Sequence, residues 1–244
     1  MDSGFYAACA GLRAQSQALE VSAHNLANLN TIGFRGQQPS FQALLAVAGP
    51  VVPNVLNLAI NNFGVLEGTH LDRSAGNQEN TGNPLDVAIE GDGFFVIQTP
   101  QGTRYTRNGS FRMARSGELV TATGNPVLGE SGAIRVPAGA VSISSDGTLS
   151  VNSAVAGKIR LVEFSPDSQL VSEGESLLSA PNGSERPARQ TSLRQGALES
   201  SNVNAIAAMM TLIGVQREAE MMQRALSLFH SELNRVATND LPRV

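Results

Sequence analysis

Cysteine, aromatic and charged residues are all scarce in this 244-residue sequence. Cys9 is the only cysteine, which excludes an intramolecular disulfide and the usual cysteine-based zinc site. Charged residues make up 16% of the chain, and its net charge of −4 provides no basic surface for nucleic acid or an anionic membrane. We therefore expect no metal, no cofactor and no nucleic-acid partner.

Long apolar runs are missing as well. Residues 1–5 lack the basic start and the apolar stretch of a cleaved secretory signal. The most apolar region, residues 43–66, is interrupted by Pro50, Pro53 and several asparagines, so it falls short of the ~20 apolar residues that a membrane-spanning helix needs. We expect neither a secretory signal peptide nor direct membrane insertion.

Patterns typical of catalysis are also absent. His24, His70 and His230 lie in three different regions of the sequence. The segment 91–95 lacks the further glycine and the helix of a nucleotide-binding loop, and no Gly-x-Ser-x-Gly motif occurs. Asp86 and Glu90 would share one face of a strand, but no second catalytic partner accompanies them. An enzyme is therefore the weaker hypothesis, and we predict no catalytic residue.

Amphipathic helices are predicted at both ends of the chain. Over residues 3–29, large apolar side chains recur every seven residues, and the only charges are Arg13 and Glu20. Over residues 204–236, apolar residues recur at steps of three and four. Two such helices packed only on each other would be marginally stable, so helices of other subunits would supply further burial. An intramolecular bundle is the alternative.

The middle of the sequence changes to a two-residue period with many turn signals. Short β-branched runs alternate with Asn108-Gly109, Ser116-Gly117 and Asp146-Gly147. Asn-Gly and Asp-Gly favour tight hairpin turns because both central residues of such a turn need a positive φ. This pattern predicts an antiparallel β domain.

Together these patterns predict an α+β fold. We expect a discontinuous, coiled-coil-like helical domain built from paired N- and C-terminal helices, and a central antiparallel all-β domain. The predicted division is the N-terminal helix at 1–35, an extended connector at 36–82, the β domain at 83–181, a return connector at 182–201 and the C-terminal helix at 202–244.

The segment 24–35 reads His-Asn-Leu-Ala-Asn-Leu-Asn-Thr-Ile-Gly-Phe-Arg. It resembles the N-terminal signature of the bacterial flagellar rod and hook family, and segments 84–95, 105–111 and 196–204 resemble further motifs of that family in the same order. The residues that carry the signature are Asn25, Leu26, Ala27, Asn28, Asn30, Thr31, Gly33, Phe34, Ser201, Asn202 and Val203.

The resemblance implies a structural subunit of the flagellar basal-body rod. Members of the family place their terminal helices around an axial channel and their β domain outside. The implied partners are other rod subunits, proximal and distal, in a helical self-assembly, together with the flagellar type III export apparatus. The implied location is the basal body, where the rod crosses the periplasm. The motifs favour a proximal rod protein; a distal rod or other axial subunit is the alternative, and a secreted monomeric binding module is the alternative of another class.

Residue roles follow from these expectations. The asparagines and threonine of the first motif would either cap a helix end or contact neighbouring subunits. We expect the β-domain residues Tyr105, Arg107, Asn108 and Phe111 to contact neighbouring proteins. The expected assembly interface of the helices comprises Phe5, Leu12, Leu19, Leu26, Leu29, Met209, Leu212, Leu226, Phe229 and Leu233.

Overall fold

The computed structural model describes residues 2–43 and 64–239. The chain forms two compact units. The helical unit takes its residues from Met1–Ala27, Gln37–His70 and Asn204–Val244, and the β unit consists of Asn28–Gly36 and Leu71–Val203. The chain therefore passes between the two units four times.

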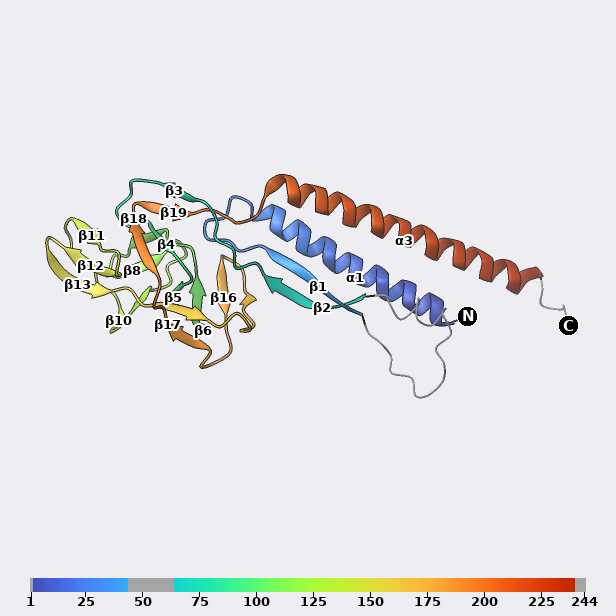
Figure 1. Ribbon diagram of the computed structural model, residues 1–244, viewed down its shortest axis with the longest axis horizontal. Helices are drawn as coiled ribbons and strands as arrows, with labels where there is room; N and C mark the ends of the chain where they lie inside the picture. Colours follow the sequence, from blue (N-terminus) through green and yellow to red (C-terminus); the bar gives the residue numbers. More distant parts are fainter. Residues whose placement is uncertain (1, 44–63, 240–244) are drawn as a thin grey trace. The chain divides into compact units, whose positions relative to one another are not determined.

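The helical unit contains two long helices and a pair of strands (Figure 1). Helix α1 spans Asp2–Ala27 and helix α3 spans Ala205–Asn239. Strand β1 (Gln37–Ala43) pairs with β2 (Gly64–Leu71). Asn204 caps α3, because its Oδ1 accepts a hydrogen bond of 3.0 Å from the backbone nitrogen of Ala207.

Helices α1 and α3 contact each other within this unit. The amide of Gln15 on α1 donates to the carbonyl oxygen of Val215 at 3.3 Å and to the Glu218 carboxylate on α3. From Gly11 to the end of α1, the buried residues are small, and they follow one another at steps of three and four: Gly11, Ala14, Ala18 and Ser22. Small side chains let helix backbones approach each other closely.

Helix α3 has a half-buried row at alternating steps of three and four residues. Its members are Ala205, Ala208, Leu212, Val215, Ala219, Met222 and Leu226. Such spacing averages 3.5 residues, the repeat of a coiled-coil seam. The expected residue Met209 is outside this row and is 50% exposed.

The β unit is built around a six-stranded antiparallel sheet. In sheet order its strands are β15 (Val171–Ser172), β16 (Leu177–Ser179), β6 (Gly102–Thr106), β5 (Phe94–Thr99), β14 (Leu161–Phe164) and β17 (Glu185–Pro187).

Smaller antiparallel sheets complete the β unit. A three-stranded sheet joins β11 (Val141–Ile143), β12 (Thr148–Val151) and β13 (Ala154–Lys158). The two-stranded pairs are β3 (Gln78–Asn80) with β19 (Ala197–Glu199), β4 (Val87–Glu90) with β18 (Ser192–Gln195), β7 (Phe111–Met113) with β8 (Leu119–Thr121), and β9 (Leu128–Gly129) with β10 (Gly132–Ala133).

Strand β5 explains why the β unit has two apolar cores. Successive side chains of a strand point to opposite faces. Phe95 and Ile97 belong to the larger core, where the Phe95 ring meets the Phe111 ring edge-on at 4.9 Å between centroids. Phe94 and Val96 belong to the smaller core with Phe164. Both faces of the central strand are thus buried, which fits its continuous apolar sequence.

The α+β fold class is confirmed: the molecule is mostly β with two long helices. Within the expected connector 36–82 the structure has β1, β2 and β3, and residues 44–63 lie outside the described part. Within the expected connector 182–201 it has β17, β18 and β19. These strands have three or four residues each, too few for alternation to stand out from the glycine and proline around them. The domain boundaries themselves stay a prediction.

Candidate functional site

Three segments of the β unit lie next to the points where the chain passes between the units. They are residues 28–36, 71–77 and 197–203, and we call them together the junction. The first and third contain signature residues of the N-terminal and C-terminal motifs. Hydrogen bonds and ion pairs join all three segments to one another inside the β unit.

Glu199 is the centre of the junction. Its side chain is only 2% exposed, and its two carboxylate oxygens face different arginines. Oε1 lies 2.7 Å from Nη2 of Arg35, and Oε2 lies 3.2 Å from Nη1 of Arg107. Oε1 also accepts a hydrogen bond of 2.8 Å from the backbone nitrogen of Gly76, and the backbone oxygen of Glu199 accepts one of 2.7 Å from Gly33. One residue therefore binds the first and second junction segments and the strand region around Arg107.

This cluster has two arginines and one carboxylate, so it carries an excess of positive charge in a buried place. Nε, Nη1 and Nη2 of Arg35 and Nε of Arg107 have no hydrogen-bond partner within the described structure; the Arg35–Glu199 contact is a close ion pair without hydrogen-bond alignment. Burial lowers the pKa of Arg35, and it lowers the pKa of Arg107 to about 10, with the charge of Glu199 opposing both shifts.

Arg107 has further partners that fix its position. Its Nη2 donates a hydrogen bond of 2.6 Å to the carbonyl oxygen of Gly91, and its guanidinium lies 5.3 Å from the centroid of the Phe94 ring. The arginine is thus bound to Glu199 on one side and to the strand region 89–94 on the other. Removing its carboxylate partner would leave a buried charge, which typically costs about 3–5 kcal/mol.

Asn202 binds the same segments through neutral groups. Its Oδ1 accepts a hydrogen bond of 2.7 Å from the nitrogen of Gly36, and its Nδ2 donates to the carbonyl oxygens of Asp72 at 3.1 Å and Ser74 at 3.0 Å. Backbone bonds run beside it, from Asp72 to Gly36 and from Ser200 to Asn77, both 2.8 Å. This signature asparagine therefore holds all three junction segments together.

The N-terminal signature is divided between the two units. Asn25, Leu26 and Ala27 end helix α1, where the Asn25 side chain exchanges two hydrogen bonds of 2.7 and 2.8 Å with the backbone of Gln37. In the β unit, Asn28 and Thr31 form a turn through bonds of 3.1 Å, and Asn30 is exposed.

Gly33 and Phe34 continue this motif in the interior of the β unit. Gly33 has φ +65°, and a Cβ at this position would overlap the Arg107–Asn108 backbone. Phe34 is buried. The motif therefore needs glycine at position 33 for two reasons, a positive φ and a close backbone approach.

The β-domain residues expected to contact other proteins are mostly buried. Tyr105 donates a hydrogen bond of 2.8 Å from its hydroxyl to Glu185, and burial with this bond raises the pKa of Tyr105 to about 12. Phe111 packs on Phe95, and Arg107 belongs to the ion cluster. Asn108 is half-buried and accepts a bond of 3.0 Å from Ser110. The structure gives these residues partners inside the β unit, and their contact with other proteins stays a prediction.

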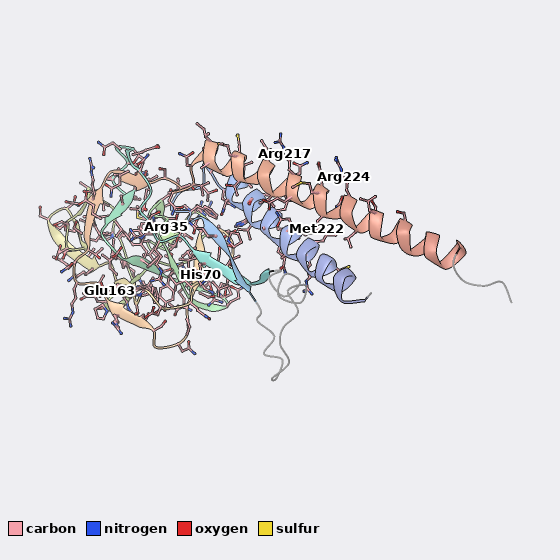
Figure 2. All side chains as sticks on the ribbon, turned by 45° about the vertical axis from the view of Figure 1, so that its right-hand side comes forward. Arg35, His70, Glu163, Arg217, Met222 and Arg224 are labelled. Atoms are coloured by element: carbon pink, nitrogen blue, oxygen red, sulfur yellow. The ribbon has the colours of Figure 1, made fainter. Side chains whose placement is uncertain are left out.

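The residues expected to form the helical interface are partly accessible. Leu12, Leu19, Leu26, Leu29, Leu212 and Leu226 are half-buried. The side chains of Phe5, Phe229 and Leu233 lie outside the described set. Figure 2 shows Arg217, Met222 and Arg224 along α3 and Arg35 in the β unit.

Sequence reasoning missed two features of the site. It quoted Arg35 and Glu199 within motifs without pairing them, although isolated charges in otherwise polar or apolar motifs were the available signal. It also named only one of the exposed apolar residues of α3, Met209, as an interface residue. We call six residues of α3, each at least half exposed, its apolar stripe: Ile206, Met209, Met210, Ile213, Met221 and Leu228. The exposed Arg217 and Arg224 interrupt the stripe after Ile213, because they lie on the same helix face.

The β unit also contains a cavity lined largely by charged and aromatic side chains. Its volume is about 290 Å³, and its lining includes Arg73, Asp92, Phe94, Arg107 and Glu163. It contains no histidine or cysteine. Among the residues the structure describes, no three His, Cys, Asp or Glu side chains are grouped so that they could hold a metal ion. In the same described part, neither helix is long and apolar enough to cross a membrane.

Three family models match consecutive parts of the chain. The model described as flagella basal body rod protein matches residues 5–35, the flagellar hook protein FlgE/F/G D1 domain matches 88–151, and the flagellar basal body rod FlgEFG protein C-terminal model matches 194–236. Arg35, Arg107 and Glu199 each fall in a different one of these regions. The ion cluster therefore joins all three matched regions.

Similar proteins extend the match to nearly the whole chain. The flagellar basal-body rod protein FlgF of Mesorhizobium japonicum is 35% identical over 90% of both chains. FlgF of Escherichia coli is 37% identical over 93% of this chain and 94% of its own length. The flagellar basal-body rod protein FlgG of Bacillus subtilis is 32% identical over 87% and 89%. The chain belongs to the flagellar basal-body rod protein family.

Proposed function

We propose that the chain is a structural subunit of the bacterial flagellar basal-body rod, polymerising into a hollow drive shaft that transmits torque and encloses the export channel. The observation that carries this proposal is the similarity to FlgF proteins along about nine-tenths of both chains. The proximal rod is the proposed position. A distal position is the alternative, favoured by the similarity to FlgG.

In this proposal the terminal helices pair as a coiled coil in the inner part of the rod. Three features support the pairing: the half-buried row of α3 at coiled-coil spacing, the small buried residues of α1, and the hydrogen bonds of Gln15 to α3. Small residues on α1 would bring the two helices close together and turn the larger leucines toward other subunits.

Neighbouring subunits would cover the apolar surface of the helices. Ile206, Met210, Ile213 and Leu228 are 51–72% exposed in a single copy, and Leu12, Leu19 and Leu26 are half-buried beside the small-residue row. Exposed apolar residues that gather on one helix are typical of a protein–protein interface. Burying them against further helices would give the polymer its cohesion.

The remaining assignments rest on the family. The proposed partners are other proximal and distal rod subunits and the flagellar type III export apparatus. The proposed location is the part of the basal body that crosses the periplasm. They are supported by relatives whose names place them in the flagellar basal-body rod.

The test compares Leu19→Asp with Leu19→Met in the full-length protein. A charge at this half-buried position would oppose burial between subunits, whereas methionine keeps an apolar side chain of similar volume. We expect Leu19→Met to restore motility to a strain lacking its own copy, and Leu19→Asp to abolish rod assembly while the circular dichroism of the β unit is kept. Normal motility with Leu19→Asp would contradict the interface; a monomer that binds no rod protein would favour the secreted binding module.

A further inference from the structure

The junction segments adjoin the points where the chain passes from one unit to the other. Between its two units the covalent chain crosses at 27/28, 36/37, 70/71 and 203/204, and each crossing is within a few residues of a junction segment. These crossings are the covalent routes by which a force applied to one unit reaches the other. Whether the junction segments detach from the β unit under such a force therefore depends on the bonds that hold these segments together.

We propose that the Arg35–Glu199–Arg107 cluster, with Asn202, is a clamp that fixes the crossing segments to the β unit under mechanical load. The load itself follows from the proposed function as a torque-transmitting rod subunit, so that part of the inference rests on it. Glu199 and Asn202 are positioning residues here, since they act by holding other segments in place.

The chemistry of the cluster suits a clamp better than a stabilising core. A buried ion cluster contributes little net stability, and apolar residues of the same volume often do better. This cluster also leaves four guanidinium nitrogens without hydrogen-bond partners in the described structure. Its distinguishing feature is its geometry, because one carboxylate, carried by the segment before 203/204, binds both the segment before the 36/37 crossing and the segment after 70/71.

Asn202 complements the ionic contacts with directional ones. Its amide binds Gly36, Asp72 and Ser74, so the two segments that the Glu199 carboxylate binds, 28–36 and 71–77, are bound a second time by a neutral side chain. Peeling off one segment would break contacts to both residues together. Such coupling makes the junction resist opening as a unit.

The first experiment measures amide hydrogen exchange on the full-length protein with Glu199→Gln. The control is Glu173→Gln, which breaks an ion pair of 2.6 Å with Arg104 where the two side chains are 17% and 39% exposed. We expect the amides of Gly33, Gly36 and Gly76 to exchange at least about tenfold faster in Glu199→Gln. Strand amides of the β5–β6 ladder should change much less. Opening of the junction alone exposes both arginines to water, which relieves the cost of burying their unpaired charges, so the ladder does not have to open.

Asn202→Ala provides a second variant that leaves the charges in place. It should raise exchange at Gly36 and Asp72 in the same direction. Equal acceleration in the junction and in the β5–β6 ladder, or no difference between Glu199→Gln and Glu173→Gln, would overturn the clamp.

The second experiment separates the clamp from the proposed function. In a strain lacking its own copy, cells with Asn202→Ala should form normal numbers of flagella and swim at low viscosity, but lose rotation at high viscosity. A variant that only misfolds would reduce flagellar number at every viscosity, which would contradict the clamp. Failure of the wild-type gene to restore motility would count against the rod function, while the exchange result would still stand or fall by itself.

Discussion

The two units differ in which apolar side chains they bury. In the β unit the largest ones, such as Phe95, Ile97 and Leu119, are completely buried by residues of the same unit. In the helical unit the side chains that are fully buried in the described part are as small as Ala14 and Ala18, and α3 carries isoleucine, methionine and leucine on its surface. The β unit closes its own cores, whereas the helical unit leaves large apolar side chains exposed on α3.

The units differ in their charges as well. The β unit encloses an ion cluster that links distant parts of the sequence, while the arginines labelled on α3 in Figure 2, Arg217 and Arg224, are exposed. The first unit is therefore specified by contacts within the chain. For the helical unit we expect contacts with neighbouring subunits to matter as well, so substitutions should affect the two units differently.

The largest expected effect is that of Gly33→Ala in the β unit. The added methyl group would overlap the backbone of Arg107 and Asn108, and alanine would also have to adopt φ +65°. Overpacking and the left-handed conformation together should lower the free energy of unfolding by roughly 2–5 kcal/mol. Urea denaturation followed by circular dichroism measures this loss.

Gly82→Ala is the matched control for this change. Gly82 has φ +72°, but a Cβ there would meet nothing within 4 Å. It should cost only the conformational term, roughly 1–2 kcal/mol. If the two variants were equally stable, close packing of the first motif against residues 107–108 would be disproved.

Turn chemistry shows how far the sequence could predict the β unit. Asp146-Gly147 predicted a hairpin, and β11 and β12 pair around it with Gly147 at φ +86°. Asn108-Gly109 carried the same signal, but the strands on either side, β6 and β7, pair with other strands. A Cβ on Gly109 would overlap the carbonyl oxygen of Val87. Gly109 allows a close backbone approach, whereas Gly147 adopts a positive φ. The dipeptide alone does not distinguish these two uses of glycine.

The site was less predictable than the fold class. Arg35 and Glu199 come from opposite ends of the sequence, and no local pattern indicates that they pair. On α1 the seven-residue leucine row drew attention to Leu12 and Leu19, whereas the fully buried face is Ala14, Ala18 and Ser22. Hydrophobic periodicity ranks side chains by size, but a helix that packs closely against another buries its small ones.

A second, smaller effect concerns how the stability of the β unit depends on pH. The raised pKa of Tyr105, about 12, means that the folded protein holds this proton where an unfolded chain, with a tyrosine pKa near 10, has released it. The stability that this group contributes is complete below about pH 10, and it is lost as pH rises toward 12. Tyr105→Phe should flatten the fall of the urea midpoint over this range.

Absorbance at 295 nm tests the same prediction directly. The chain has two tyrosines, so a Tyr6→Phe background leaves Tyr105 as the only signal. Ionisation of Tyr105 in the folded protein should occur well above pH 10. Ionisation near pH 10, as in an unfolded chain, would mean that the hydroxyl is open to water and that it makes no lasting contact with Glu185.

The smallest expected effect belongs to the helical unit and uses two adjacent residues. Ile213 is 51% exposed and belongs to the apolar stripe of α3, while Leu212 is half-buried in the row at coiled-coil spacing. In the isolated chain, Ile213→Ser should change the thermal stability of the helices by no more than about 0.5 kcal/mol, as exposed substitutions usually do. Leu212→Ser should cost more, since it removes apolar area already withdrawn from water.

In the assembled protein we expect Ile213→Ser and Leu212→Ser to have similar effects. Neighbouring subunits that cover the stripe would make Ile213 as costly to replace as Leu212. Circular dichroism melting of the free chain and motility of a complemented strain give the two readings. A stability loss at Ile213 in the free chain would mean that the helical unit already covers its stripe, and the contrast between the two units would fail. Unchanged stability with lost motility would assign the stripe to contacts between subunits.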